Sequence, residues 1–142
     1  MMKRFVVAVA VLAGVCAAAS NGFAQEQNRV DVRYFHGTFR CVSCTRIEQY
    51  TRDALKERFA AELASGVLRF AEVNLEEKGN EHYVNDYKLY TKSVVLSLVV
   101  DGKEVRYLNL DKVWHLLRDK KGFYDYIETE TRKFLTEAQG GS

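Results

Sequence analysis

Two cysteines, Cys41 and Cys44, stand where the sequence changes from a strand-like to a helix-like pattern. Before them, residues 30–35 alternate apolar and polar and then end apolar, which predicts a strand. After them, apolar and small residues recur at steps of three and four. This predicts a helix of about five turns that begins at or just after Cys41 and ends before Gly66. The recurring residues are Cys44, Ile47, Thr51, Leu55, Phe59 and Leu63. Residues 67–75 predict a second strand, parallel to the first because a long helix connects them.

The segment after the second strand predicts a short helix. It covers residues 81–89, and we expect Val84, Tyr87 and Tyr83 to face the interior. Together with Tyr90, these tyrosines could form an aromatic binding stripe. Packing in the core and at its boundary is the simpler interpretation.

The end of the chain predicts a hairpin and a helix. Residues 94–100 are almost all apolar or β-branched and predict a third strand. Asp101-Gly102 is the strongest hairpin signal in the sequence, so residues 105–110 should return as an antiparallel edge strand. A helix follows, with Asp111 as its candidate N-cap and Lys120-Lys121-Gly122 as a candidate break. The resulting order, βαβαββα, predicts an α/β fold with a mixed four-stranded sheet.

Residues 1–24 have the pattern of a secretory signal. Two basic residues precede an apolar run at residues 5–19, and small residues ending at Ala24 form a cleavage site. The alternative is a membrane anchor, but a helix that crosses a bilayer usually needs about 20 apolar residues, and this run is shorter. We therefore expect a periplasmic or otherwise exported protein with one domain, residues 25–142, and no membrane span in that domain.

The charge balance argues against a nucleic-acid partner. The whole chain carries 21 Lys and Arg against 19 Asp and Glu. Both surplus basic residues belong to the predicted signal, so the remaining domain is formally neutral. The hydrophobic content of the chain, 47%, is enough for one ordinary core.

Removal of the signal would also remove Cys16 and leave Cys41 and Cys44 as the only cysteines. Disulfides form in exported proteins, but a loop this short stabilises a fold very little, so the pair is better explained by chemistry. A thiol at a helix N-terminus meets unpaired backbone N–H groups and the positive end of the helix dipole, which favour the thiolate. We expect Cys41 to be the attacking sulfur and Cys44 the buried resolving sulfur, with Arg40 adding positive charge.

The CxxC pair at a strand-to-helix junction and the ββα ending together resemble the thioredoxin fold, over about residues 30–135. This resemblance implies a three-layer sandwich in which helices flank the sheet. More narrowly, residues 34–44 read Tyr-Phe-His-Gly-Thr-Phe-Arg-Cys-Val-Ser-Cys. They resemble the small exported ArsF family, described as nitrophenyl-compound nitroreductase subunits. The resemblance implies a thiol–disulfide oxidoreductase or electron-transfer subunit. Its partner would be a protein thiol or disulfide, such as a transmembrane thiol-electron carrier. The sequence has no glycine-rich phosphate loop, so we expect no organic cofactor.

Three positions depart from the thioredoxin pattern. Thioredoxins usually carry Trp before the first cysteine, where this chain has Arg40. They carry an acidic proton relay about six residues before that cysteine, where this chain has Phe35 beside His36. They also place a cis-proline, which presents backbone to a bound peptide, opposite the pair. The equivalent loop here is at Ser93 and Val94, in a chain without proline. These departures favour one dedicated partner over general thioredoxin activity, with Arg40 and His36 tuning or supporting the cysteines.

Two other functions stay open at this point. The thiolates of Cys41 and Cys44, with His36 as a third ligand, suit Cu(I) or a thiophilic metalloid. A closed zinc site needs four ligands and would require a second copy of the chain. The other possibility is a fixed disulfide in an interaction module. The simpler interpretation of His36 is a loop histidine that bonds to backbone groups, and that of Arg40 is a solvated arginine.

Overall fold

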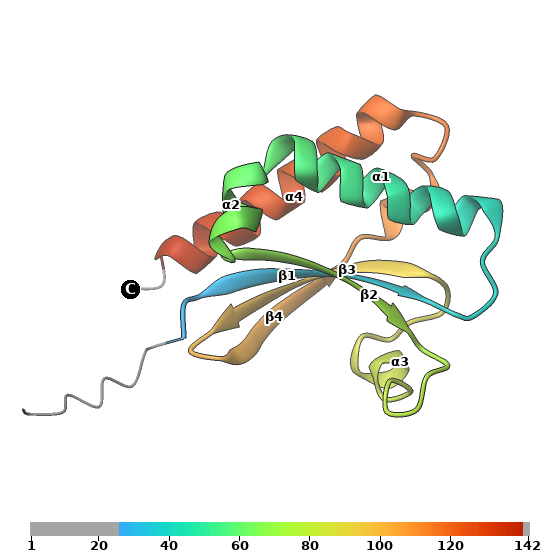
Figure 1. The fold of residues 1–142 in the computed structure, drawn as a ribbon, viewed down its shortest axis with the longest axis horizontal. Helices are drawn as coiled ribbons and strands as arrows, with labels where there is room; N and C mark the ends of the chain where they lie inside the picture. Colours follow the sequence, from blue (N-terminus) through green and yellow to red (C-terminus); the bar gives the residue numbers. More distant parts are fainter. Residues whose placement is uncertain (1–25, 141–142) are drawn as a thin grey trace, which may run out of the picture.

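A mixed four-stranded sheet with the strand order β2-β1-β3-β4 forms the centre of the computed structural model, which describes residues 26–140 (Figure 1). Its strands are β1 (Arg29–His36), β2 (Leu68–Asn74), β3 (Ser93–Val100) and β4 (Lys103–Asn109). β1 pairs parallel to β2 and antiparallel to β3, and β3 pairs antiparallel to β4. The predicted mixed sheet and element order are therefore confirmed, and the chain has a thioredoxin-like fold. The predicted signal at residues 1–24 lies outside the described residues.

Helices cover the two faces of the sheet unequally. The helices are α1 (Val42–Arg58), α2 (Ala60–Ser65), α3 (Tyr83–Asp86) and α4 (Lys120–Gly140). Figure 1 shows α1 and α4 lying together over one face, whereas the single turn of α3 lies on the opposite side. The predicted three layers are present, but the third layer is small. No helix within residues 26–140 is both long and apolar enough to cross a membrane.

The alternation of side chains along β1 creates two different packing regions. Val30, Val32 and Tyr34 are fully buried in the main core, which also contains residues of α1 and α4. Phe35 points to the other face and packs with Tyr87 in a smaller cluster. Successive side chains of a strand point to opposite faces, so one strand supplies both clusters.

The hairpin between β3 and β4 has the predicted turn. Asp101 and Gly102 have positive φ values of 50° and 75°, which is the backbone of a type I′ turn and matches the twist of the flanking strands. β4 begins at Lys103, two residues earlier than predicted, and a register shift between Leu98 and Val99 accommodates the pairing.

The predicted start of the last helix is wrong. Residues Asp111–Trp114 form only a short 3-10 helix, η1, and α4 begins at Lys120. The predicted break at residues 120–122 is in fact this helix start. Its physical cause is a cap, because the carboxylate of Asp119 accepts a hydrogen bond from the N–H of Gly122 at 2.9 Å.

Side chains around α3 are placed only partly as predicted. Tyr87 is buried and Tyr83 is half-buried, but Val84 is 39% exposed. Tyr90 is 94% exposed, so the expectation that it packs in the core or at its boundary is wrong. α3 has only one turn, so it directs only part of its side chains onto the sheet, and Tyr90 lies beyond its end.

Candidate functional site

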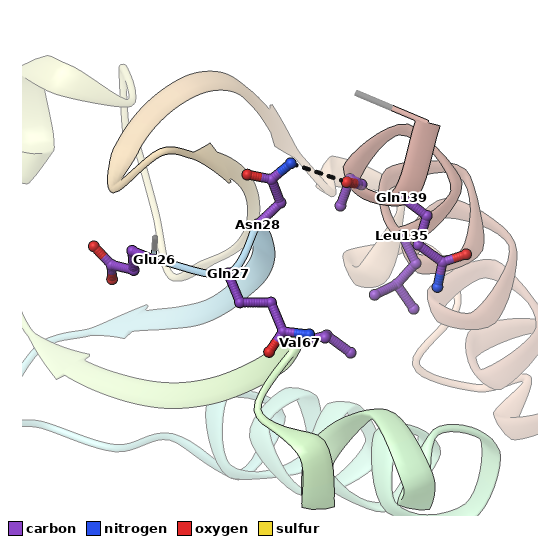
Figure 2. A pocket seen from close by; sticks show the side chains of 7 residues that line it. Glu26, Gln27, Asn28, Val67, Leu135 and Gln139 are labelled. Atoms are coloured by element: carbon purple, nitrogen blue, oxygen red, sulfur yellow. Dashed lines mark hydrogen bonds between the residues drawn. The ribbon is translucent and has the colours of Figure 1, made fainter. Parts of the chain in front are cut away.

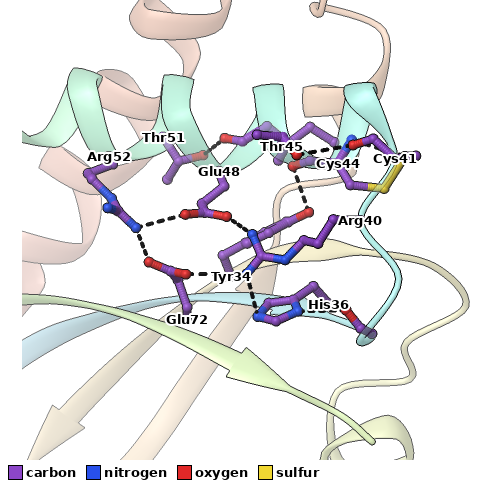
Figure 3. Close-up of polar contacts among 12 residues, drawn as sticks. Tyr34, His36, Arg40, Cys41, Cys44, Thr45, Glu48, Thr51, Arg52 and Glu72 are labelled. Carbon is purple, nitrogen blue, oxygen red and sulfur yellow. Dashed lines mark hydrogen bonds and ion pairs between the residues drawn. A yellow bond between two sulfur atoms is a disulfide. The ribbon is translucent and has the colours of Figure 1, made fainter.

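Cys41 and Cys44 are joined by a disulfide at the start of α1, with their Cα atoms 5.0 Å apart (Figure 3). Cys44 is only 1% exposed and belongs to the buried face of the helix, whereas Cys41 is partly exposed. The two sulfurs are therefore unequally accessible, in the direction that the sequence predicts. A partner can approach Cys41 and is kept from Cys44.

Cys41 is the N-cap of α1, a helix of 17 residues. Its backbone is extended, and its Sγ accepts a hydrogen bond from the N–H of Cys44 at 3.1 Å. The first turn of α1 contains no acidic residue whose charge would oppose an anion there. When the disulfide is reduced, this N–H and the positive end of the helix dipole favour a thiolate at Cys41.

Tyr34 of β1 forms a hydrogen bond with the backbone of the buried cysteine. Its side chain is fully buried, and its hydroxyl donates a hydrogen bond to the backbone carbonyl of Cys44 at 2.8 Å. Burial raises the pKa of Tyr34 to about 12, against a smaller opposing effect of the Arg40 charge. The phenol therefore stays protonated, and stays a donor, over the pH range in which thiols ionise.

Arg40 lies beneath α1 in a cluster of charges. Its guanidinium forms an ion pair with Glu48 of α1, a second one with Glu72 of β2 at 3.3 Å, and a hydrogen bond to Nε2 of His36 at 2.9 Å. Figure 3 shows the side chain extending toward these groups, so its charge is balanced by two carboxylates. The solvated-arginine interpretation is wrong, and the predicted effect of Arg40 on Cys41 stays a prediction.

Arg52 completes this cluster, which we call the Arg40 cluster: His36, Arg40, Glu48, Arg52 and Glu72. Arg52 forms ion pairs with Glu48 at 2.8 Å and with Glu72. The sequence analysis missed Glu48, Arg52 and Glu72. The spacing of four residues from Cys44 to Glu48 and again to Arg52 is a signal that could have found two of them, since such residues share one helix face.

His36 is the last residue of β1 and is buried, so its predicted place in a loop is wrong. Its Nδ1 lies 2.8 Å from the carbonyl of Gly37 and donates to it, which leaves Nε2 as the acceptor for Arg40. Both ring nitrogens are therefore engaged, and the one bonded to Gly37 meets a backbone group, as the simpler interpretation expects. Within residues 26–140, no group of three or more His, Cys, Asp or Glu is arranged to hold a metal. His36, the third ligand of the metal-binding alternative, is held by Gly37 and Arg40 in this arrangement.

The loop that corresponds to the cis-proline position is the turn before β3. Ser93 is the first residue of β3, is buried, and donates from its hydroxyl to the carbonyl of Thr91 at 2.8 Å. Val94 is fully buried in the main core. The indole Nε1 of Trp114 donates to the carbonyl of Lys92 at 2.9 Å. Side chains of this chain therefore already bond two consecutive carbonyls of this turn.

A separate pocket of about 440 Å³ lies at the opposite end of the sheet (Figure 2). It is formed by the residues before β1, the start of β2 and the end of α4. Across it, the side-chain amide of Asn28 donates to the carbonyl of Ala138 at 3.2 Å. This pocket adjoins the start of β1 and the disulfide follows its end, so the pocket is not part of the cysteine site.

Among solved structures, this chain is similar to several thioredoxins. No protein-family profile and no curated protein matches the chain. Thioredoxin from Fasciola hepatica is 21% identical, with 78% of this chain and 81% of that chain covered and a TM-score of 0.42. Chlamydomonas reinhardtii thioredoxin f2 is 20% identical, with 68% of this chain and 83% of that chain covered and a TM-score of 0.40. A Schistosoma mansoni thioredoxin is 19% identical, with 70% of this chain and 83% of that chain covered and a TM-score of 0.41. The strand order, the helix positions and the CxxC disulfide at the start of α1 are what make the fold thioredoxin-like.

Proposed function

We propose that this chain is an exported dithiol protein that exchanges electrons with a dedicated protein partner through Cys41 and Cys44. The observation that carries the proposal is the unequal exposure of the two sulfurs at the start of α1. Cys41 is partly exposed, and its Sγ accepts a hydrogen bond from a backbone N–H, while Cys44 is 1% exposed. An attacking and a resolving thiol need this difference, because the first must meet a partner and the second must meet only the mixed disulfide.

The exchange begins with the reduced chain. The thiolate of Cys41 attacks one sulfur of a partner disulfide; a bond forms between these sulfurs, the partner's S–S bond breaks, and the released thiolate takes a proton from water. Cys44 then loses its proton to solvent and attacks Sγ of Cys41. The intrachain disulfide forms and the mixed disulfide breaks. The second partner thiolate takes a proton from solvent, so the chain has lost two electrons and the partner leaves as a dithiol. The reverse sequence oxidises the partner.

Two groups support the first turn of α1 in this proposal. The hydrogen bond from Tyr34 holds the carbonyl of Cys44, and the contacts of Arg40 hold the loop before Cys41 against β1 and α1. We assign Arg40 and His36 positioning functions, since their side chains bond to each other and to groups of the surrounding elements. The positive charge of Arg40 supports a thiolate at Cys41 only to the extent that Glu48 and Glu72 leave it unbalanced.

Export and the identity of the partner depend on the sequence. The signal pattern at residues 1–24 supports an oxidising compartment, where a dithiol needs a source of electrons. The resemblance of residues 34–44 to the ArsF family supports a transmembrane thiol-electron carrier as that source. The absence of proline supports one dedicated partner rather than many.

A redox titration tests the proposal. The purified protein is equilibrated with glutathione and with dithiothreitol buffers, and its free thiols are counted, alongside Cys41→Ser and Cys44→Ser. We expect a reversible two-electron couple, mixed disulfides trapped in Cys44→Ser, and no reaction in Cys41→Ser. A disulfide that resists both reductants would contradict exchange. Tight binding of Cu(I) by thiols that titrate poorly would support the metal carrier instead.

A further inference from the structure

Large apolar side chains are exposed mainly at the end of the sheet that carries the disulfide. Residues 26–140 expose six of them, and four lie at this end: Phe39 at 78%, Val42 at 77%, Val84 at 39% and Tyr90 at 94%. Phe39 precedes Cys41 by two residues, and Val42 lies between the two cysteines. Val84 and Tyr90 belong to the segment between β2 and β3. Isolated exposed apolar residues are ordinary, but a group of them beside a reactive site indicates contact with another molecule.

Val84 and Tyr90 line a pocket of about 230 Å³, which we call the Tyr90 pocket. Residues at the end of β1, residues that follow β1 and β2, and residues 89–92 contribute to its lining. Its apolar lining comes from Leu75, Val84, Leu89 and Tyr90. Two of these, Leu75 and Leu89, also pack in the small core cluster with Phe35, so the pocket has a fixed floor and an exposed rim.

The turn at residues 91–93 cannot offer unbonded carbonyls to a partner as a strand edge would. The carbonyl of Thr91 accepts from Ser93, and that of Lys92 accepts from Trp114. These bonds also order the turn that forms one wall of the Tyr90 pocket. The Tyr90 pocket beside this turn provides an apolar surface for side-chain contacts with a partner.

The charges on the rim do not favour a charged occupant. Glu76 and Lys92 both line the pocket and carry opposite charges. Hydrogen bonds from the side chain and backbone of Thr38 lower the pKa of Glu76, so this carboxylate is ionised at neutral pH. The two charges cancel formally, so the apolar lining determines which side chain the pocket prefers.

We infer that the Tyr90 pocket receives a large apolar side chain of the partner protein, a few residues from the cysteine that reacts with Cys41. This inference rests on the proposed function. Exchange requires the partner to touch Cys41, so a pocket at the same end of the molecule lies within reach of its chain. Gly37 lines the pocket, and the four residues from Gly37 to Cys41 span at most about 14 Å. An extended partner segment covers that distance in about four residues.

The experiment uses disulfide-linked peptide dimers as probes. One peptide has a single cysteine in a Gly-Ser background. The others carry one Trp at two, three or four residues before or after the cysteine. Bis(2-hydroxyethyl) disulfide is the probe without a peptide. Rate constants for oxidation of the reduced protein are measured for the natural chain, Tyr90→Ala and Tyr90→Phe. Val105→Ala is the matched control, because Val105 is 58% exposed but lies on β4.

We expect at least one Trp peptide to react about tenfold faster than the Gly-Ser peptide, the size of effect that one apolar contact can give. Tyr90→Ala should remove most of this preference, while Tyr90→Phe and Val105→Ala keep it. The rate with bis(2-hydroxyethyl) disulfide should be the same in all four proteins.

Three results would overturn the inference. If no Trp peptide reacts faster while bis(2-hydroxyethyl) disulfide reacts normally, the pocket is not a partner site, and the proposed function survives. If none of the disulfides reacts, the proposed function fails as well. If Tyr90→Ala instead disrupts a dimer seen by sedimentation and leaves the peptide preference unchanged, the pocket is occupied by a second copy of the chain.

Discussion

Two arginines on opposite sides of the sheet have similar partners but different surroundings. On the α1 side, Arg40 contacts two carboxylates and lies over the ring of Tyr34 at 5.9 Å. On the α3 side, Arg33 contacts the carboxylate of Asp31 at 2.9 Å and the hydroxyl of Tyr87 at 3.1 Å. Each arginine therefore meets acidic groups and a tyrosine, but only the first one stands next to a reactive pair.

The comparison shows that position, and not composition, gives the Arg40 cluster its relation to the disulfide. Arg33 also bonds to Ser97 of β3 and lies 3.5 Å from Glu104 of β4, so its contacts connect strands of the sheet. Arg40 connects the loop before Cys41 with α1 and β2. Removing either arginine should therefore lower the free energy of unfolding by a similar amount, but only the removal of Arg40 should affect the cysteines.

The largest effect is expected from the side chain that anchors the α3 side. Phe35→Ala removes a fully buried ring from the small cluster, and we expect it to lower the free energy of unfolding by about 3–4 kcal/mol. Exchange with bis(2-hydroxyethyl) disulfide should persist under conditions in which the variant is folded. Urea unfolding and exchange rates measure both. A loss of exchange in folded Phe35→Ala would show that the two sides of the sheet are coupled.

The paired substitutions Arg40→Ala and Arg33→Ala test the comparison most directly. Both arginines are partly exposed, so each loss should cost about 1–2 kcal/mol of stability. Only Arg40→Ala leaves the carboxylates of Glu48 and Glu72 short of positive charge near Cys41. In that variant, alkylation of Cys41 in the reduced protein should require a higher pH than in the natural chain. Equal alkylation profiles in the two variants would show that the charge balance of the Arg40 cluster does not affect Cys41.

A smaller effect is expected from removing one hydroxyl on each side. Tyr34→Phe removes the donor to the carbonyl of Cys44, and Tyr87→Phe removes the donor to Glu104 at 2.6 Å. Each should cost about 1 kcal/mol. Only Tyr34→Phe should change the rate at which Cys44 resolves a mixed disulfide, which is followed by quenching the reaction in acid and separating the species. An unchanged rate in Tyr34→Phe would reduce Tyr34 to a purely structural residue.

The smallest effect at neutral pH is expected from the ionisation of Tyr34 and Tyr87, because it changes the free energy of unfolding only in alkaline solution. Burial raises the pKa of both Tyr34 and Tyr87 from 10.0 to about 12. A phenol whose pKa is higher in the folded state contributes stability that is complete below pH 10 and is lost as the pH rises toward 12. We expect denaturant stability to fall over this interval, and each Tyr→Phe variant to show a smaller fall. Tyrosinate absorbance during unfolding checks the assignment.

Most of the fold was predictable because its signals are local. The change from strand to helix at Cys41, the stop at Gly66 and the turn at Asp101-Gly102 each depend on neighbouring residues, and the structure has all three. The order of these elements then determines the sheet, because a long connecting helix makes two strands parallel and a tight hairpin makes two strands antiparallel. The asymmetry of the cysteines follows in the same way, since Cys41 caps the tip of the helix, whereas Cys44 lies one turn further in on its buried face.

The surroundings of the cysteines depend on contacts between distant residues. The ion pair of Arg40 with Glu72, and the bond from Trp114 to the turn before β3, join segments separated by 32 and 22 residues. Tyr90 is also left exposed, although Leu89 directly before it is buried. The sequence alone therefore determined the elements, their order and the reactive pair, through local backbone preferences. The tertiary structure decided which charges balance Arg40 and which apolar side chains stay in solvent, because these depend on where the chain returns in space.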